Sequence, residues 1–116
     1  MAQTLEQLRA ADAWQRCQGC GKDYVNLAKG LPALIMNSGL MQVVAFLHAK
    51  GGVNETLGAQ LRTWLRQRFP SVIRDDGFET FMQALMKAEP RVFQNITAEA
   101  FAWLRWVRQV APAVQK

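Results

Sequence analysis

The sequence has 116 residues, half of them hydrophobic and a fifth charged, which is typical of a folded globular protein rather than a disordered one. This length suits one core, so we expect a single domain over residues 1–116. The net charge of +5 favours a polyanionic partner, although a basic protein without such a partner has the same composition. The N-terminal residues contain neither a basic region nor an apolar run, so we expect no secretory signal and a cytoplasmic protein.

The ends of the first two helices can be predicted from local signals. Thr4 and Gln7 have the spacing of a capping box, which opens a first helix that ends near Gly19. A second helix is predicted over 23–36. Pro32 lies inside this segment, so the helix either kinks there or restarts with the proline in its first turn.

The longest uncharged stretch spans residues 30–49. It is nearly long enough for a membrane span, but polar residues and two helix breakers interrupt it, so we expect no membrane segment. A better interpretation is two buried helical pieces joined at Asn37-Ser38-Gly39, with Gly39 ending the first and Ser38 or Asn37 capping the second. The second piece is apolar on almost every side, which predicts a place in the middle of the bundle.

Three further helices follow in the remaining half of the chain. Asn54 is predicted to cap the first of them, and a short helix over 78–86 stops before Pro90. Thr97 is predicted to cap the last helix, in which Glu99 complements the helix dipole. One broad apolar face of the last helix comprises Ile96, Ala100, Trp103, Leu104, Val107, Val110 and Ala111. Because no segment alternates with period two, we predict an all-α bundle of about five to seven helices around a central apolar helix.

Two ordered series of residues resemble one known family. The first is Leu31-Pro32, Asn37-Ser38-Gly39-Leu40, Gln42, Ala45-Phe46-Leu47 and Lys50-Gly51. The second is Thr97, Glu99-Ala100, Leu104, Trp106 and Arg108. In this order they resemble the small-subunit (Cmr5) family of the type III-B CRISPR RAMP-module (Cmr) effector complex. Met41 departs mildly from the pattern, since many relatives carry a second glycine there.

The resemblance implies an all-helical, non-catalytic protein with a role in antiviral defence. Several copies would stack into a short filament beside the backbone subunits that hold the guide RNA. A basic face would lie along the duplex of guide and target RNA, while cleavage belongs to a backbone subunit and other chemistry to the large subunit. The implied partners are therefore the large and backbone subunits, copies of this chain, guide RNA and target RNA.

The residues themselves offer little for catalysis. His48 is the only histidine and lies on an apolar helix, which favours a buried, hydrogen-bonded side chain over a general base. Cys17 and Cys20 form a lone Cys-x-x-Cys without the further ligands of a zinc site, and Asp75-Asp76 is typical of a solvated turn. We therefore expect no enzyme, no cofactor and no metal.

Basic residues are the better candidates for function. Arginines on the fourth and last helices recur at spacings that place them on shared faces, and such rows can follow a phosphate backbone without reading bases. Phe101 and Trp106 lie on or beside the basic face of the last helix and are candidates for base stacking. The candidates for contact with nucleic acid are Lys29, Lys50, Arg62, Arg66, Arg105 and Arg108.

Two other functions fit parts of the pattern. A helical adaptor could use the same basic face to dock an acidic protein, with no contact to RNA. The break at Asn37-Ser38-Gly39 also has the shape of a helix-turn-helix, but the helix after it is almost uncharged and too apolar for a DNA major groove.

Overall fold

The protein is a bundle of six α-helices in a computed structural model that describes residues 2–116. The helices are α1 (Leu5–Cys17), α2 (Lys22–Ser38), α3 (Leu40–Lys50), α4 (Gly52–Arg68), α5 (Phe78–Lys87) and α6 (Pro90–Val114). No strand occurs in residues 2–116. The predicted all-α bundle of five to seven helices is confirmed. Among the described residues, none of the helices combines the length and the apolarity that a membrane crossing requires.

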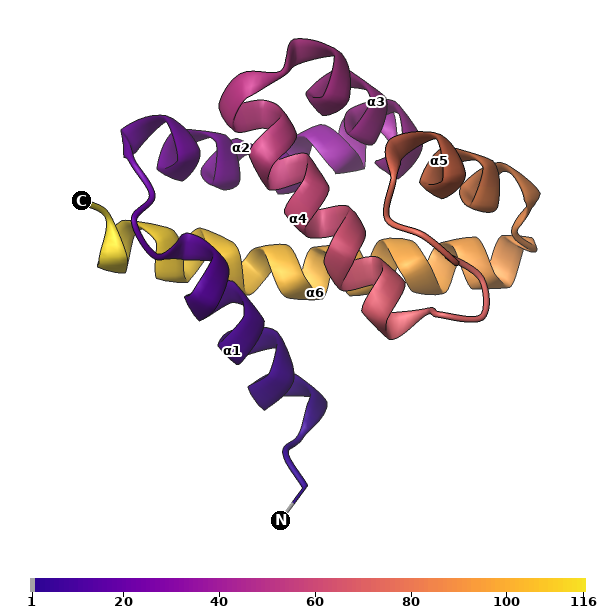
Figure 1. Ribbon diagram of the computed structural model, residues 1–116, viewed down its shortest axis with the longest axis horizontal. Helices are drawn as coiled ribbons and strands as arrows, with labels where there is room; N and C mark the ends of the chain where they lie inside the picture. The colour runs from indigo at the N-terminus through magenta and orange to yellow at the C-terminus, as the bar shows by residue number, and fades with distance from the viewer. Residues whose placement is uncertain (1) are drawn as a thin grey trace.

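Helix α6 is the axis of the bundle. It runs along the whole width of the molecule and packs against α1, α2 and α4 (Figure 1). Its apolar positions recur at helical spacing, so that one face enters the core. The buried apolar residues of this face are Ile96, Ala100, Trp103, Leu104, Val107 and Ala111. The predicted apolar face is confirmed, with Val110 partly buried at its edge.

Helix α3 buries one face and leaves the other in water. As predicted, Leu40, Val43, Val44 and Leu47 are buried, and they pack toward α2, α4 and α5. Phe46 on the outer side is 47% exposed. The prediction that α3 lies in the middle of the bundle is therefore wrong, and α6 takes that place. The apolar residues on the outer side of α3 stay exposed, as apolar residues often do on protein surfaces.

Most predicted helix ends in the first half of the chain are confirmed. The Thr4 side chain accepts a hydrogen bond from the Gln7 backbone N–H, and the Gln7 side chain accepts one from the Thr4 N–H. Pro32 lies inside a continuous α2, so the helix does not restart there. Gly39 alone joins α2 to α3, and its φ of 86° is one that L side chains rarely adopt. Neither Asn37 nor Ser38 caps α3, since both belong to α2.

Two predicted caps in the second half are wrong. Helix α4 begins at Gly52, two residues before Asn54, after a turn in which Gly51 and Gly52 both have positive φ. Helix α6 begins at Pro90, two turns before Thr97. Proline suits a first helical turn because its φ is already helical and its missing N–H is not needed there. Thr97 instead donates its hydroxyl hydrogen to the Phe93 carbonyl within the helix.

A buried carboxylate joins three helices. Glu99 of α6 is 6% exposed and accepts two hydrogen bonds from the Arg9 guanidinium of α1, at 2.7 and 2.8 Å. It also accepts the indole N–H of Trp64 in α4 at 3.0 Å. Burial by itself would raise the pKa of Glu99, but the hydrogen bonds from Arg9 and Trp64 outweigh burial and lower it. The sequence suggested that Glu99 complements the α6 dipole. In the structure it instead joins α1 and α4 to α6.

The Glu99→Gln variant tests this attachment. It removes the buried carboxylate and leaves Arg9 with only the exposed Glu6 as a charged partner, and breaking a buried ion pair in this way costs about 3 kcal/mol of unfolding free energy. Urea denaturation at neutral pH measures the loss. Glu79→Gln, at an exposed position of α5, serves as the control and should change little. Equal stability of the two variants would contradict the role given to Glu99.

The lowered pKa of Glu99 also predicts a pH dependence. The unfolded chain binds this proton at about pH 4.3, and the folded protein binds it only at lower pH. The stabilisation is therefore complete above about pH 4.3 and is lost as the pH falls through the folded pKa. We expect the unfolding free energy of the native chain to fall more steeply below about pH 4.3 than that of Glu99→Gln. Parallel curves in urea denaturation across this range would contradict the prediction.

Candidate nucleic-acid interface

Five of the six basic residues singled out from the sequence are exposed. They come from four helices, and only the pair on α6 lines a common hollow. The exposed five are Lys29, Lys50, Arg66, Arg105 and Arg108.

Arg62 is the exception, because it is only 5% exposed. Its two terminal nitrogens donate to the Glu55 carboxylate at 3.2 and 3.0 Å, and its Nε donates to the Asp76 carbonyl at 2.8 Å. The Arg62 hydrogen bonds lower the pKa of Glu55. The expectation that Arg62 faces outward beside Arg66 is therefore wrong: Arg62 joins α4 to the segment before α5.

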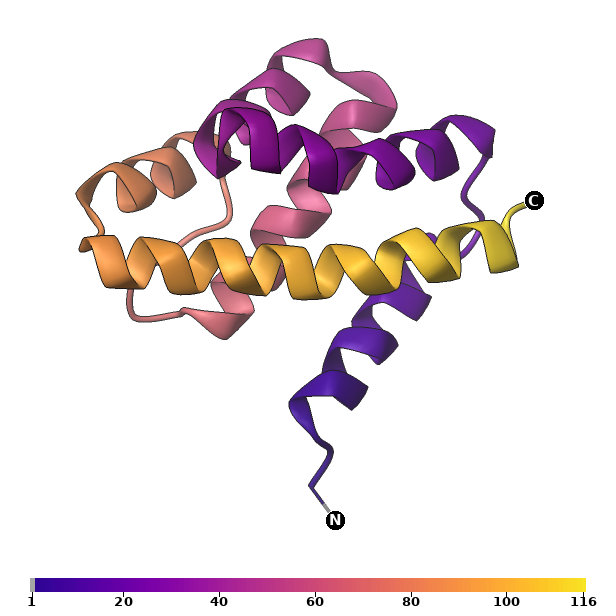
Figure 2. The same cartoon turned by 180° about the vertical axis from the view of Figure 1, so that it is seen from behind.

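Helices α2 and α6 form a groove that contains Arg105 and Arg108. The two helices run side by side in opposite directions in Figure 2. The groove has a volume of about 200 Å³, and α2 contributes Pro32 and Met36 while α6 contributes Phe101 and the two arginines. We call these five residues the α2–α6 groove. The arrangement combines an apolar lining with two cationic side chains.

No acidic residue among residues 2–116 pairs with the arginines of the α2–α6 groove or lines it. Neither forms an ion pair with a carboxylate of residues 2–116, whereas Arg9, Arg16 and Arg68 each approach an aspartate or glutamate. The sequence explains the difference, since segments 24–54 and 100–116 contain no acidic residue. The groove therefore presents positive charge that the described protein does not neutralise.

Of the other three exposed candidates, one lies on the groove side of α2 and two lie away from the groove. Lys29 precedes Met36 by seven residues, two helical turns, and therefore lies on the same side of α2. Lys50 has its ammonium nitrogen 5.9 Å from the centroid of the Phe46 ring on α3. Arg66 donates its Nε hydrogen to the Arg74 carbonyl at 3.2 Å. Lys50 and Arg66 are thus separate exposed cations outside the groove.

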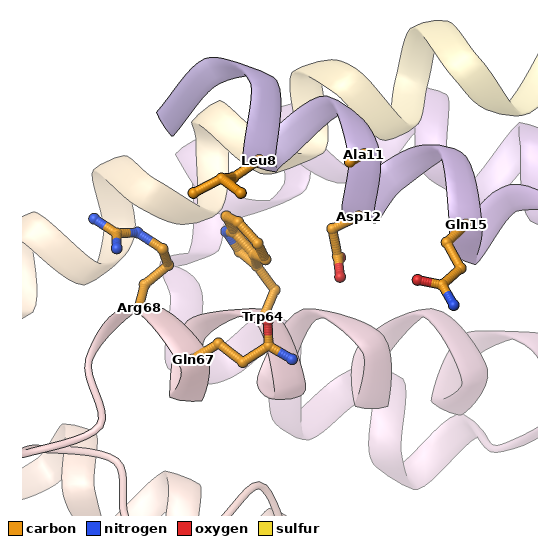
Figure 3. A pocket seen from close by; sticks show the side chains of 7 residues that line it. All are labelled: Leu8, Ala11, Asp12, Gln15, Trp64, Gln67 and Arg68. Atoms are coloured by element: carbon orange, nitrogen blue, oxygen red, sulfur yellow. The ribbon is translucent and has the colours of Figure 1, made fainter. Parts of the chain in front are cut away.

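A second hollow, of about 300 Å³, lies between α1 and α4 (Figure 3). Leu8 and Trp64 point into it from opposite helices, with Asp12 and Arg68 at its sides. Its charges already have partners: Asp12 accepts the indole N–H of Trp103, and Arg68 lies 3.8 Å from Glu99. This hollow therefore offers less free charge to a polyanion than the α2–α6 groove.

The residues considered for chemistry occupy other places. His48 is exposed rather than buried as predicted; its Nδ1 lies 3.0 Å from Glu55, and its ring stacks on Phe78 at 4.0 Å. Cys17 and Cys20 are buried free thiols, and burial raises the pKa of Cys17 to about 11. Within residues 2–116, no three His, Cys, Asp or Glu side chains gather where they could hold a metal ion.

Arg62 and Arg66 allow a direct comparison of a buried and an exposed arginine one turn apart. Arg62→Gln should lower the unfolding free energy by about 3 kcal/mol, because Glu55 loses its buried partner. Arg66→Gln should change it by less than about 0.5 kcal/mol, since Arg66 is exposed. Chemical denaturation at neutral pH measures both. A loss of stability at Arg66 and none at Arg62 would refute the assignment.

Comparison with known proteins identifies the relatives of this chain. The model of the family described as "CRISPR-associated protein (Cas_Cmr5)" matches residues 5–114. The crystal structure of a CRISPR-associated Cmr5 family protein from Thermus thermophilus has the same fold, with a TM-score of 0.77 and 24% identity over 98% of this chain and 100% of that one. No curated protein matches. The family resemblance read from the sequence is confirmed, and the chain belongs to the Cmr5 family of CRISPR-associated proteins.

Proposed function

We propose that the exposed surface formed by Lys29, Arg105 and Arg108 binds the phosphate backbone of target RNA paired with guide RNA. Family membership implies a small subunit of the CRISPR Cmr complex that associates with its other subunits. The contact with RNA goes beyond that statement. Its main support is the pair of unneutralised arginines in the acid-free α2–α6 groove.

The geometry of the α6 row suits phosphates. Residues three apart on a helix have Cβ atoms about 5–6 Å from each other, so Arg105 and Arg108 project from neighbouring points on one side of α6. An arginine can donate two parallel hydrogen bonds to a phosphate, and its charge does not titrate at physiological pH. Such contacts hold any RNA sequence, which suits a complex in which pairing with the guide supplies the specificity.

The role we propose is binding without catalysis. Within the effector complex, recognition then comes from base pairing and the cutting of RNA from another subunit, while this chain retains the target. Lys50 and Arg66 remain candidates for additional phosphate contacts, and Arg62 is withdrawn from the set because it is buried.

Contacts with protein partners require exposed apolar surface. Outside the α2–α6 groove, Met86 is 65% exposed and Trp14 56%, whereas Trp103 is fully buried. We propose the exposed apolar residues as contacts to copies of this chain and to the other Cmr subunits, since such side chains are enriched at interfaces. Met41 and Trp106 are only partly buried and can contribute at the edges.

The alternative function uses the same surface differently. A helical adaptor would dock an acidic protein segment against Arg105 and Arg108 and would make no contact with RNA. Charge reversal at the two arginines then prevents assembly of the complex, whereas under the proposed function the complex assembles and retains RNA less well.

The double variant Arg105→Glu/Arg108→Glu tests the proposal in the reconstituted Cmr complex. We expect the affinity for target RNA to fall about tenfold or more for every target sequence. The slope of log Kd against log salt should decrease by about 2, one for each lost phosphate contact. Filter binding at several salt concentrations measures both.

The matched control is Arg74→Glu/Arg91→Glu, which makes the same change in net charge at two exposed residues outside the groove. It should leave the salt slope nearly unchanged. If the two double variants weaken RNA binding equally, the effect belongs to net charge and the proposed surface is wrong. If the complex with the α6 variant does not assemble, the adaptor function is favoured.

A further inference from the structure

We infer that the α2–α6 groove holds one unpaired base of the bound RNA, with Arg105 and Arg108 on the adjoining phosphates. The inference rests on the proposed function and extends it from the backbone of the RNA to a base. It starts from an observation that phosphate binding leaves unexplained: the cations border an apolar hollow rather than a flat polar surface.

The lining suits a base. Phe101 lies one helical turn before Arg105, so its ring and the guanidinium project on the same side of α6. Across the groove, Met36 presents a polarisable thioether chain that is 78% exposed, and Pro32 also lines this wall. Bases stack on aromatic side chains regardless of their identity, and arginine planes add to this stacking.

The groove's combination of apolar lining and charge selects its occupant. A purely aliphatic peptide would leave the two guanidinium groups without partners, and a phosphate chain alone would leave Phe101 and Met36 in water. A nucleotide satisfies both parts. The base has to be unpaired, because pairing and stacking in a duplex cover the faces that an aromatic ring contacts.

The size of the groove limits the number of bases. Its volume of about 200 Å³ is below the range of about 300–1,000 Å³ that is usual for pockets holding drug-sized ligands. A single base therefore fits better than a stacked pair. Since Arg105 and Arg108 border the same hollow, they are positioned for the phosphates on either side of that base.

Removing the Phe101 ring and removing the base from the RNA should both weaken RNA binding. In the reconstituted Cmr complex, Phe101→Ala should weaken target RNA binding by about fivefold or more. A set of target RNAs, each with one abasic position, then locates the base. The RNA that lacks the base held in the groove should bind the native complex less tightly. With this RNA, Phe101→Ala should cause little further loss of affinity. Non-additivity at that position is the signature of direct contact.

Two variants separate stacking from folding. Phe101 is partly buried against the core, so Phe101→Leu keeps most of its packing while removing the flat aromatic face. It should lose RNA affinity and keep a thermal unfolding midpoint close to that of the native chain. Phe93→Leu, at a partly buried phenylalanine of α6 outside the groove, should change neither property.

The outcomes distinguish this inference from the proposed function. If the Phe101 variants bind every RNA as tightly as the native chain while Arg105→Glu/Arg108→Glu binds weakly, the groove holds no base and the phosphate contact stands. If neither change affects RNA binding, both proposals fail. If the Phe101 variants fold but do not enter the complex, the groove contacts a protein subunit and the inference is overturned.

Discussion

The fold and the candidate site both depend on α6, which has one side buried in the core and another side that carries free arginines. One side is fixed by burial of Trp103 and its apolar neighbours and by the hydrogen bonds of Glu99 to Arg9 and Trp64. These contacts hold α1 and α4 against the helix. The remaining side borders α2 and carries Arg105 and Arg108 without acidic partners. A helix anchored on one side presents its free charges in a fixed geometry, which reduces the entropy lost when they bind a ligand.

Much of the fold and half of the groove can be predicted from local sequence patterns. Helical periodicity places the apolar face of α6 correctly, and the same periodicity puts Arg105, Arg108 and Phe101 together on another side. The capping box at Thr4 and the break at Gly39 also follow from short-range chemistry. These features depend on residues a few positions apart, so that a single chain segment contains the necessary information.

Features that depend on distant segments could not be predicted in this way. No local pattern indicates that Glu99 meets Arg9, ninety residues away, or that Pro32 and Met36 form the other wall of the groove. Arg62 illustrates the same limit: its spacing from Arg66 predicts a shared face, but Glu55 and the Asp76 carbonyl hold it inside the protein. Separating a binding arginine from one that holds the fold together requires knowing where the carboxylates lie.

The most direct test of the account is a cryo-electron microscopy structure of the assembled Cmr complex that contains this chain, guide RNA and target RNA. The account predicts target-strand phosphate oxygens within hydrogen-bonding distance of Arg105 and Arg108, with α6 facing the RNA. Density for another protein subunit over Arg105 and Arg108, with the RNA on a different side of the bundle, would contradict it.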